Sequence, residues 1–160
     1  MTRDQHLPRW LAVLIPLALL AGAWGSQLIG HLYPCEMCHW QRWPHYAAVP
    51  VALLAFVVPR PAVAKLLIAL AALLIATSGA IGVYHAGVEY HWWEGVTACT
   101  STARLDGATA ADRLRQLMDA PIVRCDTAQW TLGGISLAGF NAIISLGGAV
   151  AIAALLMRRR

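Results

Sequence analysis

The sequence predicts an all-α membrane protein, a bundle of four transmembrane helices, from its composition, its apolar stretches and its basic residues. Of the 160 residues, 59% are hydrophobic and only 12% are charged. Soluble domains carry roughly 25% charged residues, so the deficit indicates a lipid bilayer as the main solvent. The length suits a single integral membrane domain over 1–160. No basic stripe with interleaved aromatic residues occurs outside the apolar segments, and we therefore expect no nucleic-acid partner.

Four apolar stretches predict the four spans, at about 11–30, 41–58, 66–84 and 135–157. A spanning helix needs about 20 mostly apolar residues, and three of the stretches satisfy this length directly. The second stretch is shorter but can extend upstream through Trp40. Small residues recur along the other three and let helices pack closely in lipid. The first stretch also fits a cleavable signal peptide, although we expect it to be a retained helix.

The basic residues predict which side of the membrane each loop occupies. Seven of them share one side, with a single acid against them: Arg3, Arg9, Arg60, Lys65, Arg158, Arg159 and Arg160. The net charges of the two sides are then +6 and −2, which together give the formal +4. Because cytoplasmic segments carry the excess of lysine and arginine, both termini are expected in the cytoplasm. The segments 31–40 and 85–134 are then the two outer loops.

The second outer loop contains a short predicted helix. Thr109 is a suitable N-cap, with Asp112 three residues on, and helical spacing continues to Met118. Apolar side chains such as Leu114 fall on one side of this helix and arginines on the other. The pattern predicts a helix that lies flat at the lipid interface, and a helix packed on the surface of the loop fits it equally.

All four cysteines, Cys35, Cys38, Cys99 and Cys125, fall in the two expected outer loops. Disulfides persist in an oxidising outer compartment. The first two form a Cys-x-x-Cys motif, whose closed loop is too short to stabilise the fold much by cross-linking. Such pairs typically take part in thiol–disulfide chemistry rather than stabilising the fold. Cys38 directly precedes the second span, so helix amides and Arg42, one helical turn on, are expected to stabilise a thiolate there.

The other two cysteines lie 26 residues apart in the long loop. That spacing suits a disulfide that another protein opens. Two structural disulfides are the plainer alternative. Three histidines flank the Cys-x-x-Cys motif, but they match no usual spacing of zinc ligands, and we expect no metal site; they are His31, His39 and His45.

This ordered pattern resembles the DsbB family of quinone-dependent disulfide bond formation proteins, over nearly the whole chain. Arg42 follows Cys38 by four residues, as the family's arginine does. Cys125 is followed by Gln129-Trp130 at the entrance of the last helix, and His85 ends the third helix 14 residues before Cys99. The pair inside the motif, Glu36-Met37, departs from the more apolar pair usual in the family.

The resemblance implies an enzyme of the bacterial inner membrane that passes electrons from a periplasmic DsbA-like dithiol oxidase to a membrane quinone, ubiquinone or menaquinone. It implies that the partner attacks the Cys99–Cys125 disulfide, and that Cys125 then attacks Cys35. Cys38 is released as a thiolate facing the quinone, and such exchange proceeds by thiolate attack on sulfur. Arg42, Cys38 and His85 are the expected quinone-binding residues, with His91 as the alternative to His85.

Two other functions remain open from the residues. A vitamin K epoxide reductase-like protein also joins a membrane Cys-x-x-Cys motif to loop cysteines and a quinone, but there the loop cysteines precede the motif in the chain. A non-enzymatic membrane scaffold with structural disulfides is the other alternative. Trp40, Trp43 and Tyr46 either line the quinone site or belong to the aromatic belt of a membrane interface.

Overall fold

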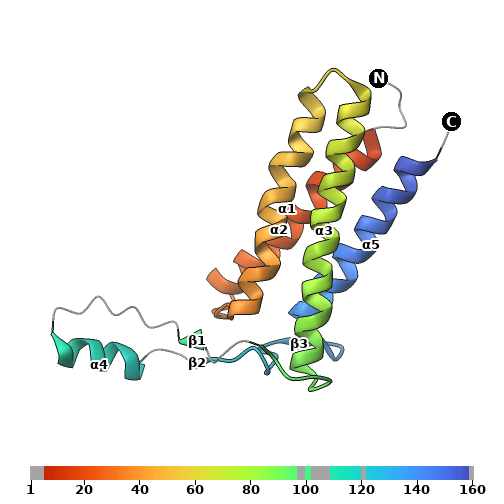
Figure 1. Ribbon diagram of the computed structural model, residues 1–160. Helices are drawn as coiled ribbons and strands as arrows, with labels where there is room; N and C mark the ends of the chain where they lie inside the picture. The colour runs from red at the N-terminus through yellow and green to blue at the C-terminus, as the bar shows by residue number, and fades with distance from the viewer. Residues whose placement is uncertain (1–5, 97–99, 102–108, 120–121, 159–160) are drawn as a thin grey trace.

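The computed structural model describes residues 6–96, 100–101, 109–119 and 122–158. The described chain is mostly helical. Four long helices, α1 (His6–Leu28), α2 (Glu36–Val57), α3 (Pro61–Glu89) and α5 (Leu137–Met157), form a bundle, and a short helix α4 (Ala110–Asp119) lies to its side (Figure 1). The beginning of α1 and the end of α5 lie at one end of the bundle, and the strands lie toward the other (Figure 1).

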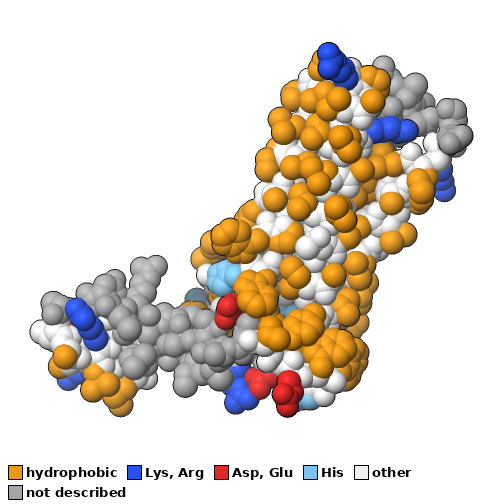
Figure 2. Space-filling view, in the orientation of Figure 1, with side chains coloured by type: hydrophobic (Ala, Val, Ile, Leu, Met, Phe, Trp, Pro, Cys, Tyr) orange, Lys and Arg blue, Asp and Glu red, His pale blue; other side chains and the backbone are white. Residues whose placement is uncertain are grey.

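Three helices, α1, α3 and α5, are long and apolar enough to cross a membrane. Figure 2 shows hydrophobic side chains along the length of the bundle, with charged side chains gathered toward its ends. The helix α2 does not reach the same hydropathy because its first turns are polar. Its second half nevertheless exposes apolar side chains, among them Leu53, Leu54 and Val57, which is 75% exposed. The described spans therefore number three by composition, and α2 is a fourth bundle helix.

Small residues bring the bundle helices close together, as expected for helices in lipid. The helix α3 packs most extensively against α5 and α2. A Cβ atom at Gly79 would lie 2.8 Å from the Leu146 side chain, and one at Gly82 would lie 3.0 Å from the Ala138 carbonyl oxygen. Buried alanines from all four helices make up most of the core. Glycine and alanine at these contacts therefore set the distance between the helices.

Two small sheets of two strands each form in the segment between α3 and α5. Strand β1 (Thr100–Ser101) pairs antiparallel with β2 (Ile122–Val123), with Thr100 opposite Val123. Strand β3 (Thr131–Leu132) pairs with β4 (Ile135–Ser136) through the turn Gly133-Gly134. Both turn glycines have positive φ, +60° and +81°, as a two-residue hairpin turn requires.

The helices α1, α2 and α3 are longer than the predicted spans, whereas α5 begins two residues later than predicted. The helix α2 begins at Glu36, within the first predicted outer loop, and α3 continues to Glu89, into the second. At 1.5 Å per residue, the 29 residues of α3 rise about 44 Å, more than the roughly 30 Å of a hydrocarbon core. Its last turns therefore extend beyond the apolar layer and carry polar residues.

The predicted helix in the second loop is confirmed as α4. The Asp112 backbone N–H donates to Thr109 Oγ1 at 3.1 Å, and the Thr109 N–H donates back to Asp112 Oδ2 at 3.3 Å. This reciprocal pair is a capping box, with aspartate in place of the usual glutamate. Leu114 and Met118 are exposed, at 58% and 77%. Whether α4 lies on a lipid surface stays a prediction.

Candidate functional site

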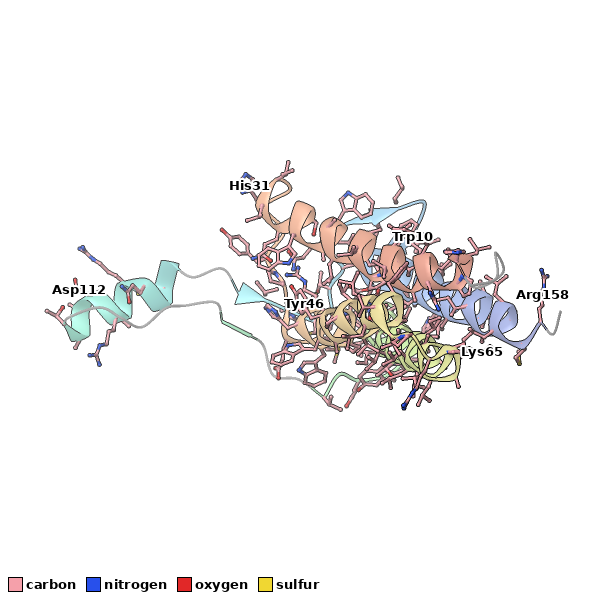
Figure 3. All side chains as sticks on the ribbon, turned by 90° about the horizontal axis from the view of Figure 1, so that it is seen from above. Trp10, His31, Tyr46, Lys65, Asp112 and Arg158 are labelled. Atoms are coloured by element: carbon pink, nitrogen blue, oxygen red, sulfur yellow. The ribbon has the colours of Figure 1, made fainter. Side chains whose placement is uncertain are left out.

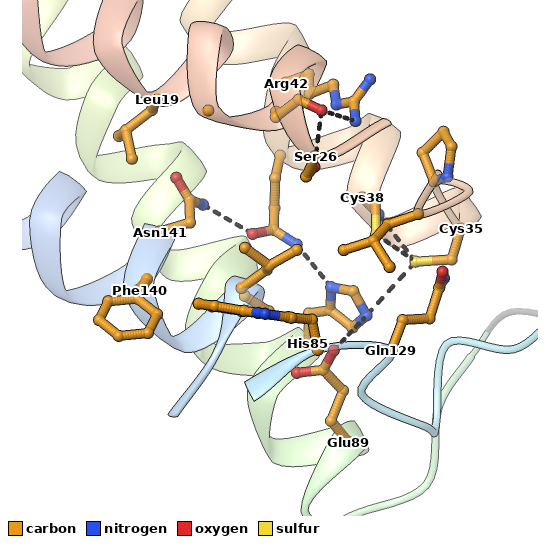
Figure 4. Close-up of a pocket in the computed structure, with 18 of the residues that line it drawn as sticks. Leu19, Ser26, Cys35, Cys38, Arg42, His85, Glu89, Gln129, Phe140 and Asn141 are labelled. Atoms are coloured by element: carbon orange, nitrogen blue, oxygen red, sulfur yellow. Dashed lines mark hydrogen bonds and ion pairs between the residues drawn. The ribbon is translucent and has the colours of Figure 1, made fainter. Parts of the chain in front are cut away.

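A cavity of about 330 Å³ lies at the end of the bundle that carries the loops (Figure 4). The helices α1, α2, α3 and α5 and the segment 124–130 all contribute to its wall. Most of its lining is apolar, and its polar groups include Cys35, Cys38, Arg42, His85 and Glu89. Such a cavity, apolar with a few convergent polar groups, is typical of a small-molecule site.

Three cysteine sulfurs converge at one edge of this cavity. Cys35 and Cys125 are buried, and Cys38 is half-buried. The sulfurs of Cys35 and Cys38 lie 2.7 Å apart. Cys125 Sγ, Cys35 Sγ and a ring nitrogen of His85 all lie within 4.8 Å of one another. The structure thus brings a cysteine of the second loop to the Cys-x-x-Cys motif.

Cys35, rather than Cys38, occupies the N-cap of α2. Its sulfur accepts a hydrogen bond from the Cys38 backbone N–H at 3.2 Å. The expected amide contact to Cys38 Sγ is thus made by Cys35 Sγ, because the helix begins one turn earlier than the span. Hydrogen bonds with Cys125 and Cys38, together with burial, raise the pKa of the Cys35 thiol. Cys35 therefore holds its proton more firmly than an ordinary cysteine.

His85 connects the cysteines to the rest of the cavity. Its Nε2 lies 3.5 Å from Cys35 Sγ and 3.7 Å from Glu89 Oε1, and Gln41 Nε2 lies 2.6 Å from its Nδ1 (Figure 4). Both the histidine and the glutamate side chains are buried, at 2% and 8% exposed. They come from the last turns of α3, one helical turn apart.

Arg42 is held by α1. Its guanidinium donates to Gln27 Oε1 at 2.8 Å and to the Ala23 carbonyl oxygen at 3.1 Å, and it lies 5.6 Å from the centre of the Trp24 ring. The side chain lines the cavity and is 8% exposed. The charge is thus fixed on the α1 side of the cavity. The sequence predicted that Arg42 lies near Cys38, but it did not predict the contacts of Arg42 with α1.

A polar network continues from the cavity into the bundle. His45 Nε2 lies 3.0 Å from Asn141 Oδ1 and 2.8 Å from Ser78 Oγ. The Asn141 amide donates to Gln41 Oε1 at 2.8 Å, and Ser145 Oγ donates to Asn141 Oδ1 at 3.1 Å. Polar groups inside a membrane are costly unless they are paired, and this network pairs most of its members, although His45 Nδ1 has no hydrogen-bond partner among the described residues. Through Asn141, the network also forms a hydrogen bond with the Gln41 side chain.

The structure also bears on the remaining predicted site residues. Cys99 lies outside the described residues. His91 is exposed, in a turn after α3 with φ +58°, whereas His85 lines the cavity. The aromatic residues that line the cavity are Tyr33, Trp130 and Phe140. The predicted aromatics Trp40, Trp43 and Tyr46 are instead exposed on the surface of α2.

Sequence reasoning missed Gln41, Glu89 and Asn141. Each is a polar residue within or next to an apolar stretch, and that signal alone marked them as unusual. Their common role was not visible because they come from three helices, α2, α3 and α5. Only the packing of those helices brings them to one cavity.

Among the described residues, three side chains could hold a metal ion. The donor atoms of Cys35, His85 and Cys125 lie close enough together for a thiophilic ion such as zinc. The same proximity is also what thiol–disulfide exchange between Cys35 and Cys125 requires. The arrangement of donors therefore admits both chemistries.

Comparison with known proteins assigns a family. The model of the family described as disulfide bond formation protein DsbB matches residues 5–155. An uncharacterized protein of Rickettsia prowazekii (strain Madrid E) is 23% identical over 135 residues, covering 84% of this chain and 77% of that protein. No solved structure matches the chain.

Proposed function

This chain belongs to the DsbB family, and we propose that it reoxidises a periplasmic DsbA-like dithiol and passes the electrons through two cysteine pairs to a membrane quinone. Family membership implies a role in disulfide bond formation and thiol oxidoreductase activity. The particular route, the partner and the acceptor are the proposal. The observation that carries it is the meeting of Cys35, Cys38 and Cys125 at the edge of an apolar cavity.

The meeting of Cys125 with Cys35 supports transfer between the two cysteine pairs. In the proposed relay, the Cys125 thiolate bonds to the sulfur of Cys35, the Cys35–Cys38 bond breaks, and Cys38 leaves as a thiolate. A sulfur with a lower thiol pKa is the better leaving group. Because the pKa of Cys35 is raised, attack on Cys35 that expels Cys38 is the favoured direction.

Contact with the protein partner is assigned to Cys99. The strand β1 begins at Thr100, directly after this cysteine, and β2 ends at Val123, two residues before Cys125. The pairing of β1 with β2 brings these two segments together, and we assign the disulfide between Cys99 and Cys125 in the resting enzyme from membership of the family. The partner's thiolate would form a mixed disulfide with Cys99 and release Cys125, whose sulfur then turns to Cys35.

The cavity suits a quinone head group. It is mainly apolar, and Cys38 and the fixed guanidinium of Arg42 both belong to its wall. A quinone bound there supplies an acceptor for two electrons and two protons. Arg42 would hold the oxygen on which negative charge develops, and Cys38 would face the ring. His85 contributes to the wall beside Cys35, while Trp130 and Phe140 would flank the ring.

The chain is a multi-pass membrane protein, and we assign it four spans in the bacterial inner membrane with both termini in the cytoplasm. The beginning of α1 and the end of α5 share one end of the bundle (Figure 1), and the residues that line the cysteine cavity belong to the other end. Lys65 and Arg158 lie toward the end opposite His31 (Figure 3). The position of these two basic residues at one end supports a cytoplasmic location for that end by the positive-inside rule.

Quinone absorbance provides the test of the function. The purified protein, mixed with a reduced DsbA-like dithiol protein and a ubiquinone analogue, should convert quinone to quinol in step with oxidation of the partner. A variant with Cys38→Ser should exchange thiols with the partner and leave the quinone unchanged. Absence of quinone loss with all four cysteines intact would reject the proposal.

A further inference from the structure

The orientations of two amide side chains in the cavity wall are fixed by backbone carbonyls. Asn141 Nδ2 lies 3.2 Å from the Ser78 carbonyl oxygen, and a carbonyl can only accept, so the nitrogen belongs on that side. Gln41 Nε2 lies 3.3 Å from the Met37 carbonyl oxygen, which fixes Gln41 in the same way. The two orientations agree, since Asn141 Nδ2 then donates to Gln41 Oε1 at 2.8 Å.

The orientation of Gln41 decides which nitrogen of His85 carries the proton. Gln41 Nε2 is a donor and lies 2.6 Å from His85 Nδ1, so Nδ1 must accept. A neutral imidazole has one protonated nitrogen, and here it must be Nε2. The Nε2–H group faces Cys35 Sγ at 3.5 Å and Glu89 Oε1 at 3.7 Å (Figure 4).

We propose that Gln41 is a positioning residue, which holds His85 as a hydrogen-bond donor to the sulfur of Cys35. His85 then stabilises the Cys35 thiolate and is not the base that removes its proton. Glu89 and the Cys125 backbone are the competing acceptors for the same N–H. The Glu89 side chain is buried, and its Oε2 has no hydrogen-bond partner among the residues that the structure describes.

Cys35, Glu89 and the Cys125 backbone compete for one donor, so the contact with Cys35 depends on the state of that residue. When Cys35 is in a disulfide, its sulfur is a poor acceptor and the Nε2–H group serves the Glu89 carboxylate. When Cys35 is a thiolate, both acceptors are ionised, and the sulfur, at 3.5 Å against 3.7 Å for the carboxylate, then shares the hydrogen bond. The place of this exchange in the electron relay rests on the proposed function, whereas the tautomer itself does not.

The same tautomer opposes metal binding at Cys35, His85 and Cys125. A metal ion needs an unprotonated ring nitrogen, and Nε2 is the nitrogen that faces the two sulfurs. Moving the proton to Nδ1 would set it against the Gln41 amide nitrogen. The cluster is therefore built for hydrogen bonding to sulfur rather than for zinc.

Nitrogen NMR of His85 tests the proposal directly. In the full chain labelled with ¹⁵N-histidine, fully reduced and without quinone, the His85 resonances should show the tautomer protonated at Nε2. Gln41→Leu should shift them toward a mixture of tautomers, whereas Gln129→Leu should not, because Gln129 donates to the Tyr33 carbonyl at 2.6 Å. A Nδ1-protonated or doubly protonated His85 in the unmodified protein would overturn the proposal, whatever the variants do.

The thiol of Cys35 gives a second readout. It can be titrated alone, by the ultraviolet absorbance of the thiolate, in protein that carries Cys38→Ala, Cys99→Ala and Cys125→Ala. Adding Gln41→Leu should raise the pKa of Cys35 by about one pH unit, or about tenfold less thiolate at a fixed pH. Adding Gln129→Leu should leave it unchanged. Equal titration curves for the Gln41→Leu and reference proteins would contradict the proposal.

These measurements separate the two proposals, because neither uses a quinone or a partner protein. A correct tautomer with no quinone reduction would refute the proposed function alone. Quinone reduction with the opposite tautomer would refute only the role of Gln41.

Discussion

At the scale of single residues, the site separates two sulfurs that the Cys-x-x-Cys motif treats alike. Cys35 caps α2, is 2% exposed and keeps its proton, while Cys38 lies one turn into the helix and opens on the cavity. In the proposed relay, the first would be attacked by Cys125. The second would leave as a thiolate toward the quinone. The difference follows from where the helix begins.

Arg42→Ala should weaken quinone reduction while thiol exchange with the partner persists. The guanidinium has two anchors on α1, so its charge is preorganised at the cavity wall. We expect the apparent KM for quinone to rise at least about tenfold, which corresponds to about 1.4 kcal/mol. Arg42→Lys should recover only part of this, since lysine lacks the planar fork that serves both anchors.

The control for this prediction is Arg60→Ala, which removes an exposed charge at the start of α3. Its quinone kinetics should match those of the unmodified protein. Unchanged quinone kinetics in Arg42→Ala itself would remove Arg42 from the proposed site.

The sequence identified the cysteines, Arg42 and His85 as candidates because their spacing carries chemical meaning. It could not predict that Arg42 would be anchored by α1, or that Gln41 and Glu89 would flank His85. The contacts of Arg42 with Gln27 and of Gln41 with His85 join residues 15 and 44 positions apart on different helices, and Glu89 lies one turn from His85 on α3. A single sequence gives residue types and spacing, but such contacts depend on how the helices are rotated about their axes.

At the scale of elements, the end of α3 organises the loops around the site. Trp93 folds back onto this helix, donates its indole N–H to the Tyr84 carbonyl oxygen at 2.9 Å and stacks on the Tyr84 ring. The space that the indole occupies exists because residue 87 is glycine: a Cβ there would lie 2.0 Å from the Trp93 ring.

Gly87→Ala should therefore destabilise the protein, although alanine is the better helix former. Displacing a packed ring costs about 1–3 kcal/mol, more than the roughly 1 kcal/mol that alanine contributes by helix propensity. Gly147→Ala in α5 is the matched control, because a Cβ there meets nothing within 4 Å. The melting temperature in detergent should fall for the first variant and hold or rise for the second. Equal melting temperatures would show that the Trp93 ring can move aside without loss of stability.

Tyr90, which follows α3, connects that helix to the β3–β4 hairpin. Its hydroxyl donates to the Gly134 carbonyl oxygen at 2.8 Å and accepts from the Ser136 backbone N–H at 2.9 Å. Ser136 is buried and is the N-cap of α5. Tyr90→Phe leaves that buried N–H without its acceptor, which should cost about 1–3 kcal/mol.

Thermal unfolding in detergent would again measure this loss. Tyr84→Phe is a suitable comparison, because the Tyr84 hydroxyl donates at 3.2 Å to the carbonyl of Glu94 at an exposed position, where water can replace it. A loss of the same size in both variants would argue against the anchoring role of Tyr90.

Apolar length predicted the helices, and capping residues predicted α4. The helix ends were less accessible, because α2 and α3 continue through polar residues beyond the apolar layer. Periodic apolar patterns stop where the lipid stops, whereas a helix continues as long as its backbone hydrogen bonds are made. The small sheets were not anticipated, since two-residue strands carry no periodic signal.

At the scale of the whole molecule, the arrangement depends on whether α2 crosses the membrane. Its 22 residues rise about 33 Å, close to the thickness of a hydrocarbon core. It packs extensively against α3, which is apolar enough to span. Its exposed residues in the second half are apolar, as lipid-facing residues should be. These features support a fourth span despite the polar first turns.

Labelling of single cysteines decides this arrangement. In a background where the four native cysteines are replaced by serine, exposed positions on each connection can be tested one at a time in right-side-out membrane vesicles: His31→Cys, Ala62→Cys, Thr109→Cys and Arg158→Cys. With four spans and cytoplasmic termini, a membrane-impermeant maleimide should label the first and third before lysis, and the second and fourth only after it. If α2 lay on the membrane surface instead, positions 31 and 62 would be labelled from the same side.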